Sequence, residues 1–314
     1  MAFNHKHLID ITEYSADDIM TILQTAEMFR PVNERRIKKV PTLKGYTVVN
    51  MFNEPSTRTR SSFELAEKRM SCDTLNFGGS STSTVKGESL VDTVKTLCSY
   101  KIDCIVVRDK HAGVPRKVAD VSGVHVIDAG DGKHQHPTQA LLDLYTIWQH
   151  KGSFEGLNVG IVGDIGHSRV CGSLVPALKT MGCKVTLVAP ATLLPARPDV
   201  LGADFVTSKI EEALPELDVV YMLRIQRERL EGAPFPNLRE YQLLYGLNKE
   251  REKFMKPDAI VCHPGPINRG IELDSYMADH PQRSVVLDQV YAGVLVRMAA
   301  LYLLLGGDED GLTA

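Results

Sequence analysis

The chain has 314 residues, more than one hydrophobic core usually supports, so its length predicts two domains. Its formal net charge is only −3 with histidines neutral, and 43% of its residues are hydrophobic. These values are typical of a soluble globular protein and argue against a general binder of polyanions. A chain this close to neutral has to concentrate its cations in a pocket if it binds an anion.

The sequence shows no signal for secretion or membrane insertion. Residues 1–7 lack the apolar region of a signal peptide, and the longest apolar helical stretch, Val294–Leu305, carries Arg297. Six cysteines are scattered without Cys-x-x-Cys spacing, and most lie in or beside apolar segments. We therefore expect a cytoplasmic protein with no membrane or nucleic-acid partner.

The N-terminal half alternates between predicted strands and helices. A first helix has Ser15 as its N-cap and Asp18 at the third helical position. Strands are then expected at 46–52, 74–77, 103–107 and 125–128, with helices at 57–71, 88–100, 113–120 and 136–150. Continuous β-branched strands between helices are typical of a parallel sheet covered by helices.

The alternation pauses at 149–152 and resumes with a strand at 157–162. Further strands are expected at 184–188, 203–206, 218–222 and 259–262, followed by a final helix at about 285–305. We place the domain boundary near residue 150. The expected fold class is α/β, with two doubly wound parallel-sheet domains covering residues 1–150 and 151–284.

The segment 54–64, with the sequence EPSTRTRSSFE, leads from the first strand of the alternation into its helix. Unpaired N–H groups and the positive end of the helix dipole favour an anion at a helix N-terminus. The hydroxyls of Ser56, Thr57 and Thr59 add directed donors, and the guanidinium of Arg58 fits phosphate oxygens. The alternative interpretation is an ordinary N-cap with surface arginines. The combination favours a phosphate site.

Groups that suit anions also follow the other predicted strands. Ligands of open α/β sheets bind beyond the carboxyl ends of the strands. Six such ends carry Arg58, Arg108, His136, Arg169, Arg224 and the pair Gly265–Pro266. Random surface arginines would not be distributed in this way, so the sequence predicts anion binding at these strand ends.

Three segments together closely resemble the aspartate carbamoyltransferase family, catalytic chain. They are STRTR at 56–60, HPTQ at 136–139 and HPGPINRGIE at 263–272. The first two are specific to carbamoyltransferases in general, and the third resembles the aspartate enzyme rather than the ornithine enzyme. The likeness runs almost from end to end of the chain.

The resemblance implies transfer of the carbamoyl group from carbamoyl phosphate to L-aspartate, the committed step of de novo pyrimidine biosynthesis. No metal or other cofactor is expected for this reaction. The resemblance also implies a carbamoyl phosphate-binding domain at 1–150, onto which the final helix at about 285–305 packs back, and an aspartate-binding domain at 151–284. Interdomain helices would join the two.

The resemblance further implies a role for each matching residue. The expected phosphate ligands are Ser56, Thr57, Arg58, Thr59 and Arg108, and the expected carbonyl ligands are Thr59, Arg108 and His136. Gln139 and the backbone of Gly265–Pro266 would hold the amide nitrogen. Arg169 and Arg224 would bind the two carboxylates of aspartate, because guanidiniums bind carboxylates bidentately, and Gln226 would assist. The expected catalytic residues are Arg58, Thr59, Lys86, Arg108 and His136.

His136 precedes Pro137 at a predicted helix start, where the dipole disfavours the imidazolium form. A neutral imidazole can still donate one hydrogen bond to a carbonyl oxygen. The identity of the proton acceptor is left open, because the departing phosphate could take the amine proton itself. For His134 an ordinary surface or core role suffices.

The loop 78–89 is small, polar and rich in hydroxyls, and it could simply be a mobile connection. The resemblance implies a homotrimer in which Lys86 of this loop and a nearby hydroxyl enter the neighbouring subunit's site and contact aspartate. Ser81, Thr82, Ser83 and Thr84 could each supply that hydroxyl. Assembly with dihydroorotase or with regulatory chains is left open.

Three other functions compete with this interpretation. A carbamoyltransferase for ornithine would call for carboxylates where the sequence offers Arg169 and Arg224. A nucleotide-dependent Rossmann enzyme is suggested by 162–166, but this string lacks the G-x-G-x-x-G spacing. A non-catalytic homologue would be expected to have lost part of the set His136, Arg108 and Lys86.

Overall fold

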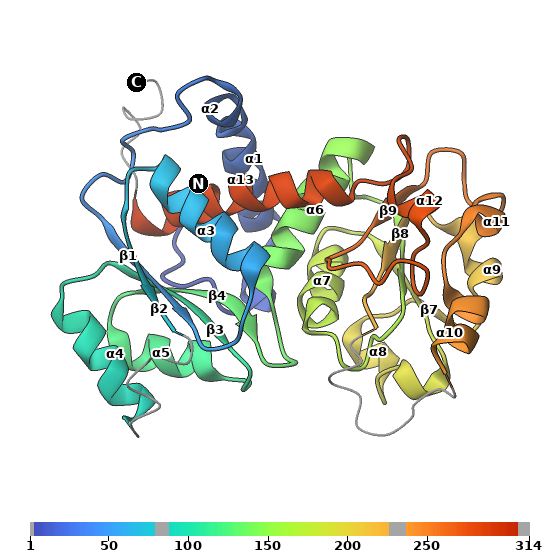
Figure 1. Ribbon diagram of the computed structural model, residues 1–314, viewed down its shortest axis with the longest axis horizontal. Helices are drawn as coiled ribbons and strands as arrows, with labels where there is room; N and C mark the ends of the chain where they lie inside the picture. Colours follow the sequence, from blue (N-terminus) through green and yellow to red (C-terminus); the bar gives the residue numbers. More distant parts are fainter. Residues whose placement is uncertain (1–2, 79–87, 226–236, 307–314) are drawn as a thin grey trace. The chain divides into compact units, whose positions relative to one another are not determined.

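The computed structural model describes residues 3–78, 88–225 and 237–306, and Figure 1 shows its helices and strands. The chain divides into two compact units, one formed by residues 1–142 with 291–314 and the other by residues 143–290. Each unit is built on its own parallel β-sheet. The predicted α/β class with two parallel sheets is confirmed.

The first unit contains a four-stranded sheet in the order β2-β1-β3-β4. Its strands are β1 (Thr47–Phe52), β2 (Asp73–Phe77), β3 (Cys104–Asp109) and β4 (His125–Asp131). Its helices are α1 (Ala16–Met28), α2 (Arg30–Glu34), α3 (Thr57–Arg69), α4 (Leu90–Ser99) and α5 (Val114–Ser122), with a 3-10 helix, η1 (Ile11–Glu13), before α1. Helix α6 (Pro137–Lys151) begins in this unit, and α13 (Val286–Leu305) ends in it.

Both faces of β1 are covered by helices, which explains its apolar sequence. Successive side chains of a strand point to opposite faces. Val49 and Met51 join a buried cluster with residues of α4 and α5, including Val118. On the opposite face, Asn50 Nδ2 donates to Glu67 Oε2 of α3 at 3.0 Å. Strands covered on both faces read as continuous apolar runs, as predicted for a parallel sheet.

The start of α1 is the capped helix that the sequence predicts. Ser15 Oγ accepts a hydrogen bond from Asp18 N at 3.1 Å, and the Asp18 carboxylate accepts one from Ser15 N at 2.9 Å. This reciprocal capping box satisfies two backbone donors that the helix itself leaves unpaired.

Helix α13 is an apolar core helix of the first unit. By length and hydropathy alone it could cross a membrane. Its residues Leu295, Val296 and Met298 are fully buried, however, and Tyr302 packs edge-on against Phe29 with ring centroids 5.7 Å apart. The packing of this helix inside the protein therefore accounts for its apolar composition.

The second unit contains a five-stranded sheet in the order β7-β6-β5-β8-β9. Its strands are β5 (Asn158–Val162), β6 (Lys184–Val188), β7 (Phe205–Thr207), β8 (Val219–Met222) and β9 (Ile260–Cys262). Its helices are α7 (Arg169–Thr180), α8 (Pro198–Leu201), α9 (Ile210–Ala213), α10 (Leu238–Tyr245), α11 (Lys249–Glu252) and α12 (Ser275–Ala278), with 3-10 helices η3 (Ala191–Leu193) and η4 (Leu214–Glu216). The chain winds outward in both directions from β5, as in a doubly wound sheet.

The strand orders gather the predicted ligand-binding loops. In the first unit β1, β3 and β4 are neighbours, and in the second unit β5, β8 and β9 are neighbours. Because all of these pairings are parallel, the carboxyl ends of each group open onto one edge of its sheet. The loops that the sequence singles out follow these six strands.

Candidate active site

The turn between β1 and α3 carries the STRTR residues of the first unit. Ser56 occupies the N-cap position of α3 in an extended conformation, but its side chain makes no capping hydrogen bond. Helices α1, α4 and α7, in contrast, each begin after a serine whose hydroxyl accepts a backbone N–H. Thr57 and Arg58 are exposed, and Thr59 is buried. An ordinary serine cap therefore does not describe α3, whose N-terminus presents the dipole end that attracts anions.

Arg108 lies near the carboxyl end of β3 and is held between the β1–α3 turn and strand β4. Its Nη2 pairs with Glu54 Oε1 of the β1–α3 turn at 3.3 Å, and its Nη1 donates to Ala129 O of β4 at 3.1 Å. The residue is only 8% exposed. The backbone adds a further link, because Asn53 N donates to Arg108 O at 2.9 Å. The structure thus brings Arg108 to the turn that carries the STRTR residues.

His136 follows β4 and stands at the start of α6. Its backbone oxygen accepts from Gln139 N at 2.9 Å, and the imidazole is buried. Gln139 lies in the first turn of the same helix and is also buried. The predicted setting of His136 at a helix start is therefore confirmed.

The two predicted aspartate-binding arginines belong to the second unit. Arg169 is the first residue of α7, after the loop that follows β5, and it is buried. Arg224 follows β8 by two residues and is partly buried. Strands β5 and β8 are paired with Val162 opposite Met222. Both arginines therefore follow adjacent strands at one edge of the second sheet.

Buried polar side chains support the loop with Gly265–Pro266. Gly265 has a φ of +62°, a left-handed conformation that favours glycine. Its N–H donates to His263 Nδ1 at 2.8 Å, and His263 Nε2 lies 3.2 Å from Glu272 Oε1. Because Nδ1 accepts a hydrogen bond, the ring proton is on Nε2 and is donated to the Glu272 carboxylate.

Asn268 connects this loop to the segment that carries Arg224. Its backbone N donates to Glu272 Oε1 at 2.6 Å, and its Nδ2 donates to Ile225 O at 3.2 Å. The loops after β8 and β9 are therefore held together by one side chain.

Other predicted site residues lie outside the described part of the chain. Lys86, Gln226 and the hydroxyl residues 81–84 belong to this group. Their roles stay predictions.

Sequence reasoning did not single out Glu54, His263 or Glu272 as parts of the site. Each lies in segment 54–64 or segment 263–272, whose other residues were predicted to bind ligands, and this is the signal that could have drawn attention to it. The partners could not be read from the motifs: Glu54 pairs with a residue 54 positions away, and the His263–Glu272 contact depends on the folding of the intervening loop.

Two family profiles match the chain in succession. The profile described as aspartate/ornithine carbamoyltransferase, carbamoyl-P binding domain, matches residues 6–149, and the Asp/Orn binding domain of the same family matches residues 155–304. Among curated relatives, the aspartate carbamoyltransferase catalytic subunit of Syntrophotalea carbinolica is 55% identical over 309 residues, which cover 98% of this chain and 98% of the relative.

Solved structures of this kind share the fold closely. Aspartate transcarbamoylase from Trypanosoma cruzi, in complex with carbamoyl phosphate and aspartate, has a TM-score of 0.87 and 29% identity and covers 96% of this chain and 97% of its own. Ornithine carbamoyltransferase from Pyrococcus furiosus has a TM-score of 0.86 and 30% identity, covering 98% of this chain and 100% of its own. Backbone similarity therefore does not separate the two specificities, and the choice between them depends on side chains and on overall identity.

Proposed function

Because this chain belongs to the aspartate/ornithine carbamoyltransferase family, we propose how its parts divide the work of one reaction. The chain transfers the carbamoyl group of carbamoyl phosphate to the amino group of L-aspartate, giving N-carbamoyl-L-aspartate and phosphate. We assign carbamoyl phosphate to residues 1–150 with the final helix, and aspartate to residues 151–284. The two family profiles, which meet between 149 and 155, support this division.

Binding of the phosphate is assigned to the β1–α3 turn and β3. Ser56, Thr57, Arg58, Thr59 and Arg108 would be its ligands. The observation that carries the assignment is the buried Arg108, which is held by a bond to Glu54 of this turn while α3 begins without a serine cap. Charge-assisted hydrogen bonds from guanidiniums and a helix N-terminus suit a phosphate dianion.

The carbonyl oxygen of the carbamoyl group is assigned to Thr59, Arg108 and His136. Attack by the aspartate amine gives a tetrahedral intermediate with negative charge on this oxygen, and donors fixed in advance stabilise that charge. Gln139 and the backbone of Gly265–Pro266 would hold the amide nitrogen. The carbon–oxygen bond to phosphate then breaks, and the amine proton passes to a base, for which the departing phosphate can serve.

The aspartate carboxylates are assigned to Arg169 and Arg224, with Lys86 and Gln226 assisting. A guanidinium can bind each carboxylate through two hydrogen bonds, and the positions of Arg169 and Arg224 after adjacent strands support a joint role. Ornithine carries a second amine in place of the second carboxylate, so cations at these positions would repel it.

We also propose a homotrimer located in the cytoplasm, in which Lys86 completes the site of a neighbouring subunit. The family resemblance supports the trimer. The compartment is supported by the six cysteines of the chain, all of which are unbonded thiols in the described residues.

Product analysis tests the proposed function. The purified protein is supplied with carbamoyl phosphate and either L-aspartate or L-ornithine, and the carbamoylated amine is identified. We expect kcat/KM for aspartate to exceed that for ornithine by at least about 10³-fold, because an ionic group left opposite the wrong charge is strongly rejected. Comparable rates with both amines would overturn the assignment of Arg169 and Arg224.

A further inference from the structure

Residues 8–12, here called the N-terminal strap, begin at β4, the edge strand of the first sheet, with which Leu8 is paired. Leu8 N donates to Val126 O, and Asp128 N donates to Leu8 O, both at 2.8 Å. Leu8 is thereby paired in parallel with Ile127. The strap occupies hydrogen-bonding groups that an edge strand otherwise leaves exposed.

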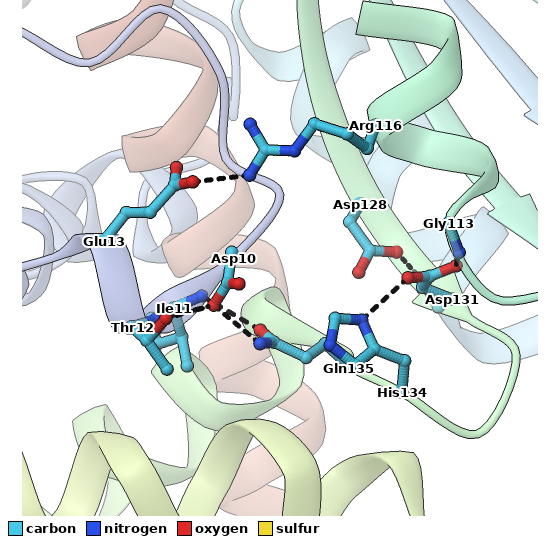
Figure 2. A network of polar contacts seen from close by, with 11 residues as sticks. Asp10, Ile11, Thr12, Glu13, Gly113, Arg116, Asp128, Asp131, His134 and Gln135 are labelled. Carbon is cyan, nitrogen blue, oxygen red and sulfur yellow. Dashed lines mark hydrogen bonds and ion pairs between the residues drawn. The ribbon is translucent and has the colours of Figure 1, made fainter.

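The strap is fastened to the β4–α6 loop by the side chain of Gln135. Figure 2 shows this amide pointing from the loop toward the strap. Its Oε1 accepts from Ile11 N at 2.9 Å, and its Nε2 donates to Asp10 Oδ1 at 2.6 Å. Gln135 is 3% exposed. An amide donates from one atom and accepts at the other, so this pair of contacts, here called the clasp, uses both ends of the group.

Asp10 is ionised when it accepts from Gln135. Burial would raise the pKa of Asp10, but hydrogen bonds from the Thr12 and Gln135 side chains and from Thr12 N outweigh it and bring that pKa below its ordinary value. The same Oδ1 atom accepts from Thr12 N at 2.9 Å and from Thr12 Oγ1 at 2.7 Å. The clasp is therefore a charge-assisted contact, stronger than one between neutral groups.

The backbone of Gln135 is fixed from the opposite side. Asp131 N donates to Gln135 O at 2.9 Å, and His134 N donates to Asp131 O at 2.8 Å. The Asp131 carboxylate also accepts from Gly113 N at 2.7 Å and lies 3.0 Å from His134 Nδ1, as Figure 2 shows. The residue directly before His136 is thus held by β4 through its backbone and by the strap through its side chain.

We propose that Gln135 is a positioning residue, whose clasp to the N-terminal strap fixes the loop so that His136 meets the carbonyl oxygen of carbamoyl phosphate. This inference rests on the role proposed for His136 above. Misplacing a catalytic group by about 1 Å can lower a rate about 100-fold, so a contact that fixes the preceding residue can matter although it touches no substrate.

Two substitutions at the same position separate positioning from general packing. Gln135→Glu keeps the size of the side chain but, when ionised, cannot donate and faces the Asp10 carboxylate. Gln135→Ala removes both contacts. We expect each to lower kcat by about 10- to 100-fold at a pH of about 8, while KM for aspartate changes by less than about 3-fold.

The two variants should differ in their pH dependence. Carboxylates that face each other share a proton as the pH falls, and the carboxyl group introduced by Gln135→Glu, once protonated, can donate to Asp10 as the amide does. The kcat of Gln135→Glu relative to the wild type should therefore rise between pH of about 8 and about 6. The ratio for Gln135→Ala should stay flat. His134, whose charge acts on Asp10, and Asp131 are present in all three proteins, so the ratios compare chains that differ only at position 135.

Further variants keep the outcomes distinct. Glu13→Gln removes an exposed ion pair with Arg116 just beyond the strap and should leave kcat unchanged. If His136→Ala has normal kcat, the role assigned to His136 is wrong. If His136→Ala is inactive but both Gln135 variants have normal kcat, the positioning role alone is overturned. The same holds if His136→Ala is inactive and the kcat of Gln135→Glu relative to the wild type does not change with pH. If neither Gln135 variant folds, Asp10→Ala breaks the clasp from the side of the strap instead. A normal kcat for Asp10→Ala would also overturn the positioning role.

Discussion

The two terminal nitrogens of the Arg108 guanidinium, Nη1 and Nη2, have separate partners. Nη1 is bonded to Ala129 O, which fixes the plane of the group, and Nη2 is paired with the Glu54 carboxylate. A buried cation without a partner would be costly, and Glu54 offsets that cost. We expect a phosphate dianion to compete with Glu54 for this guanidinium, because phosphate carries more charge and accepts bidentate hydrogen bonds.

Truncation of Arg108 or Arg58 should strongly impair the transition state. We expect Arg108→Ala and Arg58→Ala each to lower kcat/KM by the equivalent of about 3–5 kcal/mol, because a charged partner of the phosphate is lost. Steady-state kinetics with carbamoyl phosphate measures the effect, and circular dichroism checks that the fold survives. Arg108→Lys is the matched control: it keeps the charge but loses the planar fork, so its loss should be smaller. Near-normal kcat/KM for Arg108→Ala would refute the phosphate site.

Arg224 should affect one substrate and not the other. Replacing it with Ala should raise the KM for aspartate and lower kcat, because one of the two proposed carboxylate contacts is lost. Binding of carbamoyl phosphate should change little and can be measured separately by calorimetry. Equal weakening of both substrates would indicate that Arg224 supports the second unit structurally.

The positions of motif residues relative to the strands could be predicted from sequence, whereas their supporting partners could not. Arg108 and His136 were placed correctly at strand ends because parallel strands direct their carboxyl ends to one edge. The partners Glu54 and Asp10 are chosen by tertiary packing, across 54 residues for Arg108 and 125 residues for Gln135. Neither separation corresponds to a local period, so the sequence holds no signal for these pairs.

At the scale of the element, helix α3 combines an anion-attracting N-terminus with a buried acid on its inner face. Glu67 is fully buried, and its Oε2 accepts from Asn50 of β1. Burial raises the pKa of Glu67 to about 7, against the opposing effect of the hydrogen bond from Asn50. Between pH 4.5 and about 7, this carboxyl group is therefore mostly protonated in the folded chain and mostly ionised in the unfolded chain.

This difference predicts a pH-dependent stability that Glu67→Gln should remove. In that window the folded chain binds more protons than the unfolded chain, so the free energy of unfolding falls as pH rises, and the loss is complete above about pH 7. As the pH rises across this window, the free energy of unfolding of Glu67→Gln should increase by on the order of 2–3 kcal/mol relative to that of the wild type. Denaturant midpoints at fixed protein concentration and several pH values measure it. Parallel curves for Glu67→Gln and the wild type would contradict the prediction.

Long elements with a clear period were predictable, and their ends and the short helices were not. The strands expected at 103–107 and 125–128 continue to Asp109 and Asp131, because polar end residues still pair across β3 and β4. The strand expected at 203–206 is observed at 205–207, with two exposed residues on the sheet edge. Four-residue helices such as α8 and α9 span about one turn, too little for a periodic signal.

At the scale of the whole molecule, the proposed ligands are divided between the two units. Arg58, Arg108 and His136 belong to the first, and Arg169 and Arg224 belong to the second. Lys86 comes from a loop rich in Gly, Ser and Thr in a unit that already supplies two arginines to the proposed phosphate site. A long cation on such a loop is suited to reach another chain, and a ring of three chains can close by repeating one heterologous contact.

This arrangement predicts that no single chain is active and that two inactive variants can restore each other. Lys86→Ala and His136→Ala should each be nearly inactive as pure trimers. After mild dissociation and mixing, some interfaces should pair an intact His136 of one chain with an intact Lys86 of its neighbour. The sites at these interfaces then contain both wild-type residues and should be active. For random equal mixing, about a quarter of all interfaces have this composition, so recovered activity should approach a quarter of the wild-type value. Two copies of one variant, treated in the same way, serve as the control. If hybrid trimers are verified by native mass spectrometry and show no more activity than their parents, Lys86 acts within its own chain.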